Sequence, residues 1–114
     1  MKTLNQIHLT QEQRQGLSEL HIALLGTFDV VSITLFGSAA RGEAEPESDM
    51  DLLIVTRLAL PRSVRHQITD IVFDINLRHG TNFSTLVVDR ASWDAGLYSV
   101  LPLHDEIEKE GVLV

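Results

Sequence analysis

Two aspartates separated by one residue, Asp49 and Asp51, are the side chains in this sequence best suited to chemistry. They open a run of apolar residues typical of a β-strand, in which residues i and i+2 point to the same face about 6.6 Å apart. Two carboxylates on one face repel each other unless water or a cation lies between them. Mg²⁺ prefers carboxylates together with substrate phosphates, and such a pair can bridge two divalent ions. The spacing therefore predicts a magnesium site at Asp49 and Asp51.

The dipeptide Gly37-Ser38 would supply the other half of a nucleotide site. It follows an apolar run, and ten residues separate Ser38 from Asp49. Glycine lets the backbone approach a phosphate closely, and a helix that starts here would offer free N–H groups. The Ser38 hydroxyl adds one more donor. We expect Arg41 either to reach the same anion or to pair with acidic residues of the following loop.

Each half of this pattern has a plainer explanation when taken alone. A Gly-Ser pair after a strand is commonly only a turn, and an Asp-x-Asp sequence at a strand start is often only a solvated end. The two halves occur together: one predicted strand ends just before the Gly-Ser pair, and the next begins at the aspartates. We therefore favour the nucleotide-binding interpretation over two unrelated local features.

The elements that must position these residues alternate between helix and strand. Apolar periodicity and capping signals predict helices over 11–25, 39–41, 63–78, 93–100 and 103–110, and strands over 30–36, 49–56 and 83–88. We expect residues 1–9 to be frayed, residues 43–48 to form a polar loop, Ser92 to cap the helix over 93–100, and residues 113–114 to add an edge strand or to fray. This order indicates an α/β or α+β protein with a small mixed sheet flanked by helices.

Composition narrows the class of protein further. The 114 residues suit a single domain, and 44% of them are apolar, which is enough for one packed core. The net charge of −7 makes nucleic-acid binding an unfavourable interpretation, since that activity depends on Lys and Arg. There is no cysteine, the start MKTLNQIHLT lacks the apolar stretch of a signal peptide, and no apolar run reaches the roughly 20 residues of a membrane helix. We expect a cytoplasmic protein that makes no membrane contact.

The pattern resembles the signature of the polymerase-beta-like nucleotidyltransferase superfamily, and the segment LFGSAARGEAEPESDMDLLIV resembles its small bacterial members, the minimal nucleotidyltransferases. The usual form is Gly-Ser-x-Ala-Arg-Gly followed by Ser-Asp-x-Asp-Leu. The matching positions here are Gly37, Ser38, Ala40, Arg41, Gly42, Ser48, Asp49, Asp51 and Leu52. The order of elements on both sides also fits, so the resemblance implies one nucleotidyltransferase-like domain over residues 1–114.

The resemblance implies an activity, cofactors and a partner. Members of the family transfer a nucleoside monophosphate, here expected to be AMP, from an NTP to a hydroxyl acceptor and release pyrophosphate. Two Mg²⁺ ions are held by the aspartate pair and by a third carboxylate on a neighbouring strand. Minimal members often pair with a helical HEPN-type toxin and neutralise it, in some cases by adenylylation. A homo- or hetero-oligomer is therefore expected, with the acceptor hydroxyl on a partner protein.

The third carboxylate is where this sequence departs from the family pattern. Its natural position is Ser84, and Asn82, which shares that face by parity, is also uncharged. Asp89 is five residues from Ser84 and would point to the opposite face of a regular strand. The family's frequent arginine after Gly-Ser is Ala39 here. The alternative to an active enzyme is therefore a weakened or inactive nucleotidyltransferase fold that binds a nucleotide or a partner.

The remaining polar and aromatic residues favour structural roles. The five histidines are scattered without metal-ligand spacing. We expect Trp93 and Tyr98 to pack over the core, and Asp70 and Asp74 to form a solvated stripe on the helix over 63–78. The charged residues of the helix over 103–110 are expected to face solvent, with contact to a basic partner as the alternative.

Overall fold

The computed structural model describes residues 2–43 and 48–114. Part of the predicted 43–48 loop, residues 44–47, lies outside the described residues. The strands are β1 (Lys2–Thr3), β2 (Val30–Phe36), β3 (Met50–Thr56), β4 (Phe83–Asp89) and β5 (Val112–Leu113). The helices are α1 (Gln11–Leu25), α2 (Arg62–His79), α3 (Arg90–Asp94) and α4 (Pro102–Glu110), with 3-10 turns η1 (Leu4–Gln6) and η2 (Leu97–Val100).

The strands form one mixed sheet in the order β1-β5-β2-β3-β4. β2 runs antiparallel to β3 and to β5, whereas β3 is parallel to β4, and α2 provides the crossover between those two parallel strands. Six of the seven residues of β3 are buried, as expected for a strand covered on both faces, whereas β2 is buried at four of seven positions and exposes Val31. The predicted class, a small mixed sheet flanked by helices, is confirmed.

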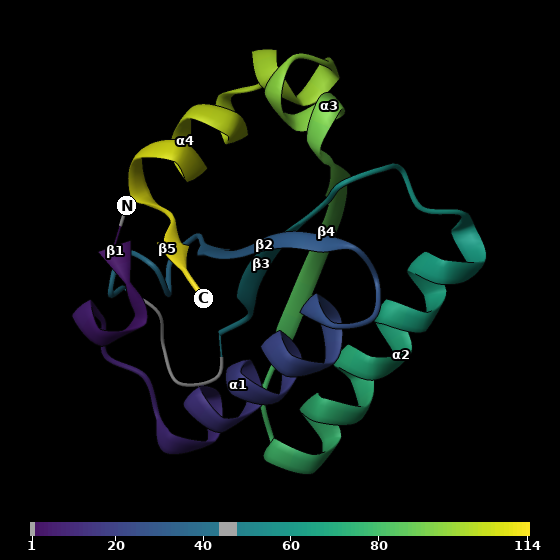
Figure 1. The fold of residues 1–114 in the computed structure, drawn as a ribbon. Coiled ribbons are helices and arrows are strands. Elements are labelled where there is room, and N and C mark those ends of the chain that lie inside the picture. Colours follow the sequence, from purple (N-terminus) through teal and green to yellow (C-terminus); the bar gives the residue numbers. More distant parts are fainter. Residues whose placement is uncertain (1, 44–47) are drawn as a thin grey trace.

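The helices cover the two faces of the sheet unequally (Figure 1). On one face α1 and α2 lie side by side over a large apolar cluster that includes Leu20, Leu52 and Ile68. On the other face α3, η2 and α4 cover a smaller cluster of five buried residues, Leu53, Val55, Val88, Trp93 and Ile107. Successive β3 residues therefore point alternately into two separate cores.

The helix α1 has the predicted bounds and the predicted cap. The Thr10 hydroxyl accepts from the Gln13 amide at 3.1 Å, and the Thr10 amide donates to the Gln13 side chain at 2.9 Å. Gly16, a poor helix former, lies where an added Cβ would come within 2.7 Å of the Phe83 ring. The glycine thus allows α1 to approach β4 closely.

The helix α2 is also close to its prediction, and Gly80 ends it in the left-handed conformation. Asn76 near its end fastens the start of β4: its side chain donates to the Phe83 carbonyl at 3.1 Å and accepts from the Phe83 amide at 2.9 Å. None of the helices within residues 2–43 and 48–114 is both long and apolar enough to cross a membrane.

Both ends of the chain are more ordered than the sequence predicts. Residues 1–9 were expected to fray, which is wrong for most of the segment: β1 pairs in parallel with β5, and η1 follows it. β5 inserts between β1 and β2, so the C-terminal segment neither frays nor forms an edge strand; the edge on this side of the sheet is β1. Pairing between the two ends of the chain stabilises both, and local sequence carries no signal for it.

The two short helices predicted from the sequence do not form as predicted. The predicted helix over 93–100 is wrong, because α3 ends at Asp94 and η2 follows separately. The N-cap of α3 is Asp89 and not the predicted Ser92. The Asp89 carboxylate accepts from the Ser92 amide at 3.0 Å and from the Ser92 hydroxyl at 2.8 Å. The predicted helix over 39–41 is a hydrogen-bonded turn, in which the Arg41 amide donates to the Gly37 carbonyl and the Glu43 amide to the Ser38 carbonyl.

Candidate active site

Asp51 lies at the start of β3, between two neighbouring strands. It pairs in register with Phe36 at the end of β2 and with Ser84 of β4. Because Leu53 on the same strand face belongs to the smaller core, Asp51 points to the α3 and α4 face of the sheet. Its side chain is half-buried, whereas Asp49 precedes the strand and is exposed.

The Gly-Ser turn lies directly against the Asp51 carboxylate. Gly37 has a φ of +79°, and an added Cβ would lie 2.8 Å from Asp51 Oδ2. A residue with a side chain would thus be strained in its backbone and would collide with the carboxylate. The sequence signature therefore brings its two halves together in space, as its phosphate-plus-metal interpretation requires.

Negative charge converges on Asp51. Its pKa is raised above the ordinary value, first by burial and then by the nearby carboxylates of Asp49 and Glu106. Glu106 comes from α4, distant in sequence, and was not among the predicted site residues. The signal that pointed to it was weak: Glu106 and Glu110 share one face of a charged helix that solvation alone explains equally well.

Arg41 connects the Gly-Ser turn to α4. Its Nη1 lies 2.9 Å from Glu106 Oε1 and 3.4 Å from Glu110 Oε2, and its Nε lies 3.2 Å from Glu43 Oε2. These acceptors raise the pKa of the guanidinium, with Glu43 the largest cause. The structure thus realises the expected pairing with a loop acid and extends it to α4, and Arg41 is engaged by carboxylates in this conformation.

The position predicted for a third acid is Ser84, and the structure places it directly beside Asp51. It is exposed and points to the same sheet face, since parallel partners share their orientation. Asn82 precedes β4 and is exposed, and its carbonyl accepts from the Met50 amide at 2.8 Å. Asp89 lies at the far end of β4, and Ser92 lowers the pKa of its carboxyl by hydrogen bonding. Asp89 is thus a helix cap, away from Asp51.

The donor set fits one nucleotide-associated Mg²⁺ better than an all-protein metal cage. Within the described ranges, no three His, Cys, Asp or Glu side chains converge closely enough to hold a metal ion. Mg²⁺, however, is commonly bound by one or two carboxylates with the substrate phosphates completing the shell. Burial raises the pKa of Asp51 most, and the neighbouring carboxylates of Asp49 and Glu106 raise it further; a cation at this position would offset the repulsion from those two carboxylates.

Trp93 and Tyr98 pack against the smaller core as predicted. The charged face of α4 is only partly solvated, which corrects its prediction, because Glu106 and Glu110 bind Arg41. Trp93 is buried, with its ring 6.3 Å from that of Tyr98 and its Nε1 donating to Glu108 at 3.0 Å. His104 stacks on the same indole at 4.5 Å. Asp70 and Asp74 are exposed, but they also border a groove that is described below. Ala39, in the place of the family's frequent arginine, is buried in the larger core.

Comparison with known proteins agrees with this geometry. The family model described as "Nucleotidyltransferase domain" matches residues 12–99. A Methanocaldococcus jannaschii protein with the provisional name protein adenylyltransferase MJ1305 is 42% identical over 77 residues, which cover 66% of this chain and 51% of that protein. The chain thus spans about half the length of this curated relative.

Solved structures share the fold. A structure provisionally described as a minimal nucleotidyltransferase superposes with a TM-score of 0.61 at 22% identity. The superposition covers 94% of this chain and 98% of the other chain. A toxin-antitoxin protein crystallised with AMP-PNP gives 0.59 at 16% identity, covering 91% of this chain and 72% of its own. The family model, which spans most of the chain, and the fold together establish that this chain belongs to the nucleotidyltransferase domain family.

Proposed function

We propose that this domain transfers a nucleoside monophosphate, AMP in the first instance, from a magnesium-bound NTP to a hydroxyl group of a partner protein. The acceptor oxygen would attack the α-phosphorus and form the new P–O bond. The bond from the α-phosphorus to the oxygen that bridges it to the β-phosphorus would break, and pyrophosphate would leave with that electron pair. The hydroxyl proton would pass to a carboxylate or to water.

The observation that carries this proposal is the contact between the Gly37 backbone and the Asp51 carboxylate. It puts the Gly-Ser turn, whose backbone and hydroxyl are the proposed phosphate donors, beside the carboxylate that would hold the cation. Catalysis of phosphoryl-type transfer depends mainly on positioning and on neutralising charge. A turn and a carboxylate this close together could contact the phosphates and the Mg²⁺ of the same bound nucleotide.

The residues have separate roles in this proposal. Asp49 and Asp51 would bind Mg²⁺, which supplies charge neutralisation for the phosphates and activation of the attacking oxygen. Gly37 and Ser38 would hold the triphosphate through backbone and hydroxyl donors. Arg41 would contact a phosphate only by exchanging one of its present carboxylate partners, so we assign it first to holding the turn against α4.

The acceptor and the compartment are proposed from the relatives. The curated relative's name describes protein adenylylation, and one solved neighbour is a toxin-antitoxin protein bound to an ATP analogue. These names support a protein acceptor and a toxin-antitoxin role; the proposal of a HEPN-type partner rests on the resemblance of the sequence to the minimal nucleotidyltransferases. Because NTPs are supplied in the cytoplasm, we propose that the reaction takes place there.

The first test is calorimetric titration of the full chain with ATP, GTP, CTP and UTP, with and without Mg²⁺. We expect saturable, Mg²⁺-dependent binding. Removing a residue that only orients a metal ligand lowers metal affinity by about 10–100-fold. The double variant Asp49→Asn, Asp51→Asn removes the ligands themselves, so its affinity for Mg²⁺-ATP should fall by at least about 100-fold. The double variant Asp70→Asn, Asp105→Asn removes the same charge from exposed positions elsewhere and should bind like the parent. Absence of Mg²⁺-dependent binding in the parent would refute the proposal for the isolated domain.

Ser84 motivates the second candidate function, a nucleotide- or partner-binding module with little turnover. Beside Asp51 it offers a hydroxyl in place of the family's acid. Transfer of label from α-labelled ATP to a co-expressed partner distinguishes the two functions. Turnover by the parent favours the enzyme. Binding without turnover, with activity gained on Ser84→Asp, favours the weakened module.

A further inference from the structure

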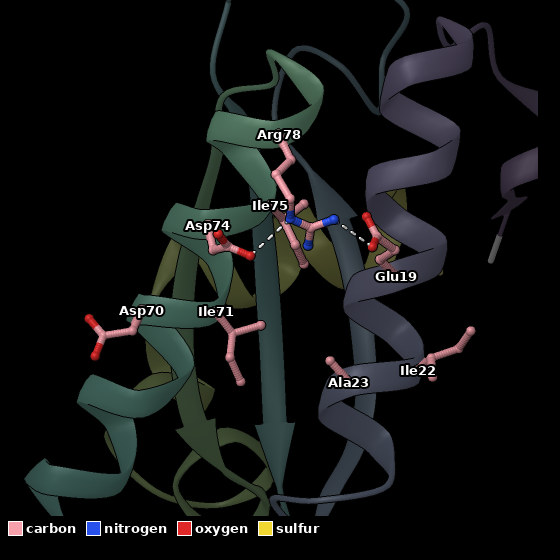
Figure 2. A pocket seen from close by; sticks show the side chains of 8 residues that line it. All are labelled: Glu19, Ile22, Ala23, Asp70, Ile71, Asp74, Ile75 and Arg78. Carbon is pink, nitrogen blue, oxygen red and sulfur yellow. Dashed lines mark hydrogen bonds and ion pairs between the residues drawn. The ribbon is translucent and has the colours of Figure 1, made fainter.

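A groove lies between α1 and α2, on the opposite side of the sheet from Asp51 (Figure 2). It has a volume of about 420 Å³. Ala23 of α1 and Ile71 and Ile75 of α2 point toward one another and form its apolar floor. Polar side chains border it, and the Arg78 guanidinium crosses one end between Asp74 of α2 and Glu19 of α1. We call this feature the α1–α2 groove, and its lining residues are Glu19, Ile22, Ala23, Asp70, Ile71, Asp74, Ile75 and Arg78.

Large apolar side chains stand exposed on the two helices that border the groove. Ile22 on α1 is 73% exposed, and Phe73 and Leu77 on α2 are 63% and 69% exposed. Phe73 and Leu77 are four residues apart and therefore share one stripe of the helix. Of these three residues Ile22 lines the groove, whereas Phe73 and Leu77 lie on α2 outside the lining and extend the exposed apolar surface beyond it.

The charges that border the groove favour a partner surface that carries positive charge. Three carboxylates, on Glu19, Asp70 and Asp74, border the groove together with one guanidinium, so the lining carries a net charge of −2. Arg78 is already neutralised, because it lies 2.8 Å from Glu19 and 2.9 Å from Asp74. The Asp70 carboxylate is exposed and forms no ion pair or hydrogen bond with side chains of the described residues. An incoming surface would therefore gain most by bringing positive charge to the Asp70 side.

We propose that the α1–α2 groove docks an amphipathic helix of a partner protein, with apolar residues at i, i+4 and i+7 flanked by Lys or Arg. An amphipathic helix places such residues along one line, which is the usual way a helix fills an apolar groove. A second copy of this chain is a poor occupant, because its own acidic rims would face these and repel them.

This inference goes beyond the proposed function, because the groove and the candidate active site lie on opposite faces of the sheet. A helix bound between α1 and α2 would leave the Gly-Ser turn and Asp51 open to nucleotide. Docking and nucleotide binding can therefore be measured independently, and failure of one leaves the other intact.

The probe is a synthetic helical peptide with Leu at i, i+4 and i+7 and Lys at the flanking positions, titrated into the isotope-labelled full chain and followed by amide NMR. Saturable shifts concentrated on α1 and α2 are expected. A matched peptide with Glu in place of each Lys should bind about tenfold more weakly or not at all. Equal affinity for both peptides, or shifts scattered over the surface, would overturn the proposal.

Two variants assign the site. Ile22→Gln should weaken the Lys peptide about tenfold, since it removes one buried apolar contact. Leu97→Gln is the matched control, because Leu97 on η2 is also 73% exposed, and it should bind like the parent. Asp70→Lys should weaken the Lys peptide and strengthen the Glu peptide. Equal effects of Ile22→Gln and Leu97→Gln would overturn the assignment, as would a dimer in light scattering that Ile22→Gln dissociates.

Discussion

The two faces of the sheet differ in how completely they are packed. Toward α1 and α2, β3 contributes Leu52 and Ile54 to a cluster that two long helices cover along its length. Toward α3 and α4, the same strand contributes Leu53 and Val55 to the smaller cluster of five buried residues. The preceding residue of β3 that points to this face is Asp51. One face therefore closes over an apolar core, and the other ends in a half-buried carboxylate.

This difference assigns separate tasks to the two faces. A carboxylate within the α1 and α2 core would be fully desolvated, at a cost of several kcal/mol for an ion. On the opposite face the short helices leave Asp51 partly solvated, so it stays available to a cation. Most of the fold's stability should come from the first face, whereas the candidate chemistry uses the second.

The largest expected effect compares Leu52→Ala with Leu53→Ala. Both side chains are buried, with 0% and 2% exposure, and they are neighbours on one strand. Leu52→Ala should lower the free energy of unfolding by about 3–5 kcal/mol, because the long helices above it cannot collapse into the cavity. Leu53→Ala should cost about 2–3 kcal/mol, since the short helices above it can relax. Urea denaturation measures both, and equal losses would remove the proposed asymmetry.

An intermediate effect is expected for Gly37→Ala. Its backbone strain costs about 1–2 kcal/mol, and the new Cβ would in addition lie 2.8 Å from Asp51 Oδ2. Gly42→Ala is the matched control, because Gly42 has a φ of +75° but no described atom within 4 Å of an added Cβ. We expect Gly42→Ala to lose stability only, and Gly37→Ala to lose more stability together with Mg²⁺-dependent ATP binding. Identical calorimetric titrations for the two variants would show that the contact with Asp51 is unimportant.

The smallest effect is a gain of stability in Asp51→Asn. The folded-state pKa of Asp51 is raised, so protonation favours the folded state, and this contribution is lost as the pH rises through the folded-state pKa. At neutral pH the ionised carboxylate therefore costs stability, and Asp51→Asn should raise the melting temperature slightly. The gain should vanish below the ordinary pKa of 3.8. Thermal melts between pH 3 and 7 test this, with Asp70→Asn as the exposed control expected to show no such gain.

Much of the fold could be predicted because its elements have strong local signals. Thr10 and Gln13 form the capping box that starts α1, and Gly80 ends α2 within one residue of the predicted bound. The apolar run of β2 identified a strand, of which residues 33–35 are buried while Val31 is 39% exposed. The short elements were less accessible, because a turn such as 38–42 and a cap such as Asp89 depend on which neighbouring group accepts each hydrogen bond.

The sequence by itself determined the spacing of Gly37, Ser38, Asp49 and Asp51, and that spacing predicts the kind of site. It also placed an uncharged Ser84 at the third position. Only the tertiary structure decided that Glu106 and Glu110 of α4 would hold Arg41, and that Glu106 would act on Asp51. The reason is physical: periodicity and capping are local along the chain, whereas the electrostatic environment of a carboxylate depends on whichever distant helix packs beside it.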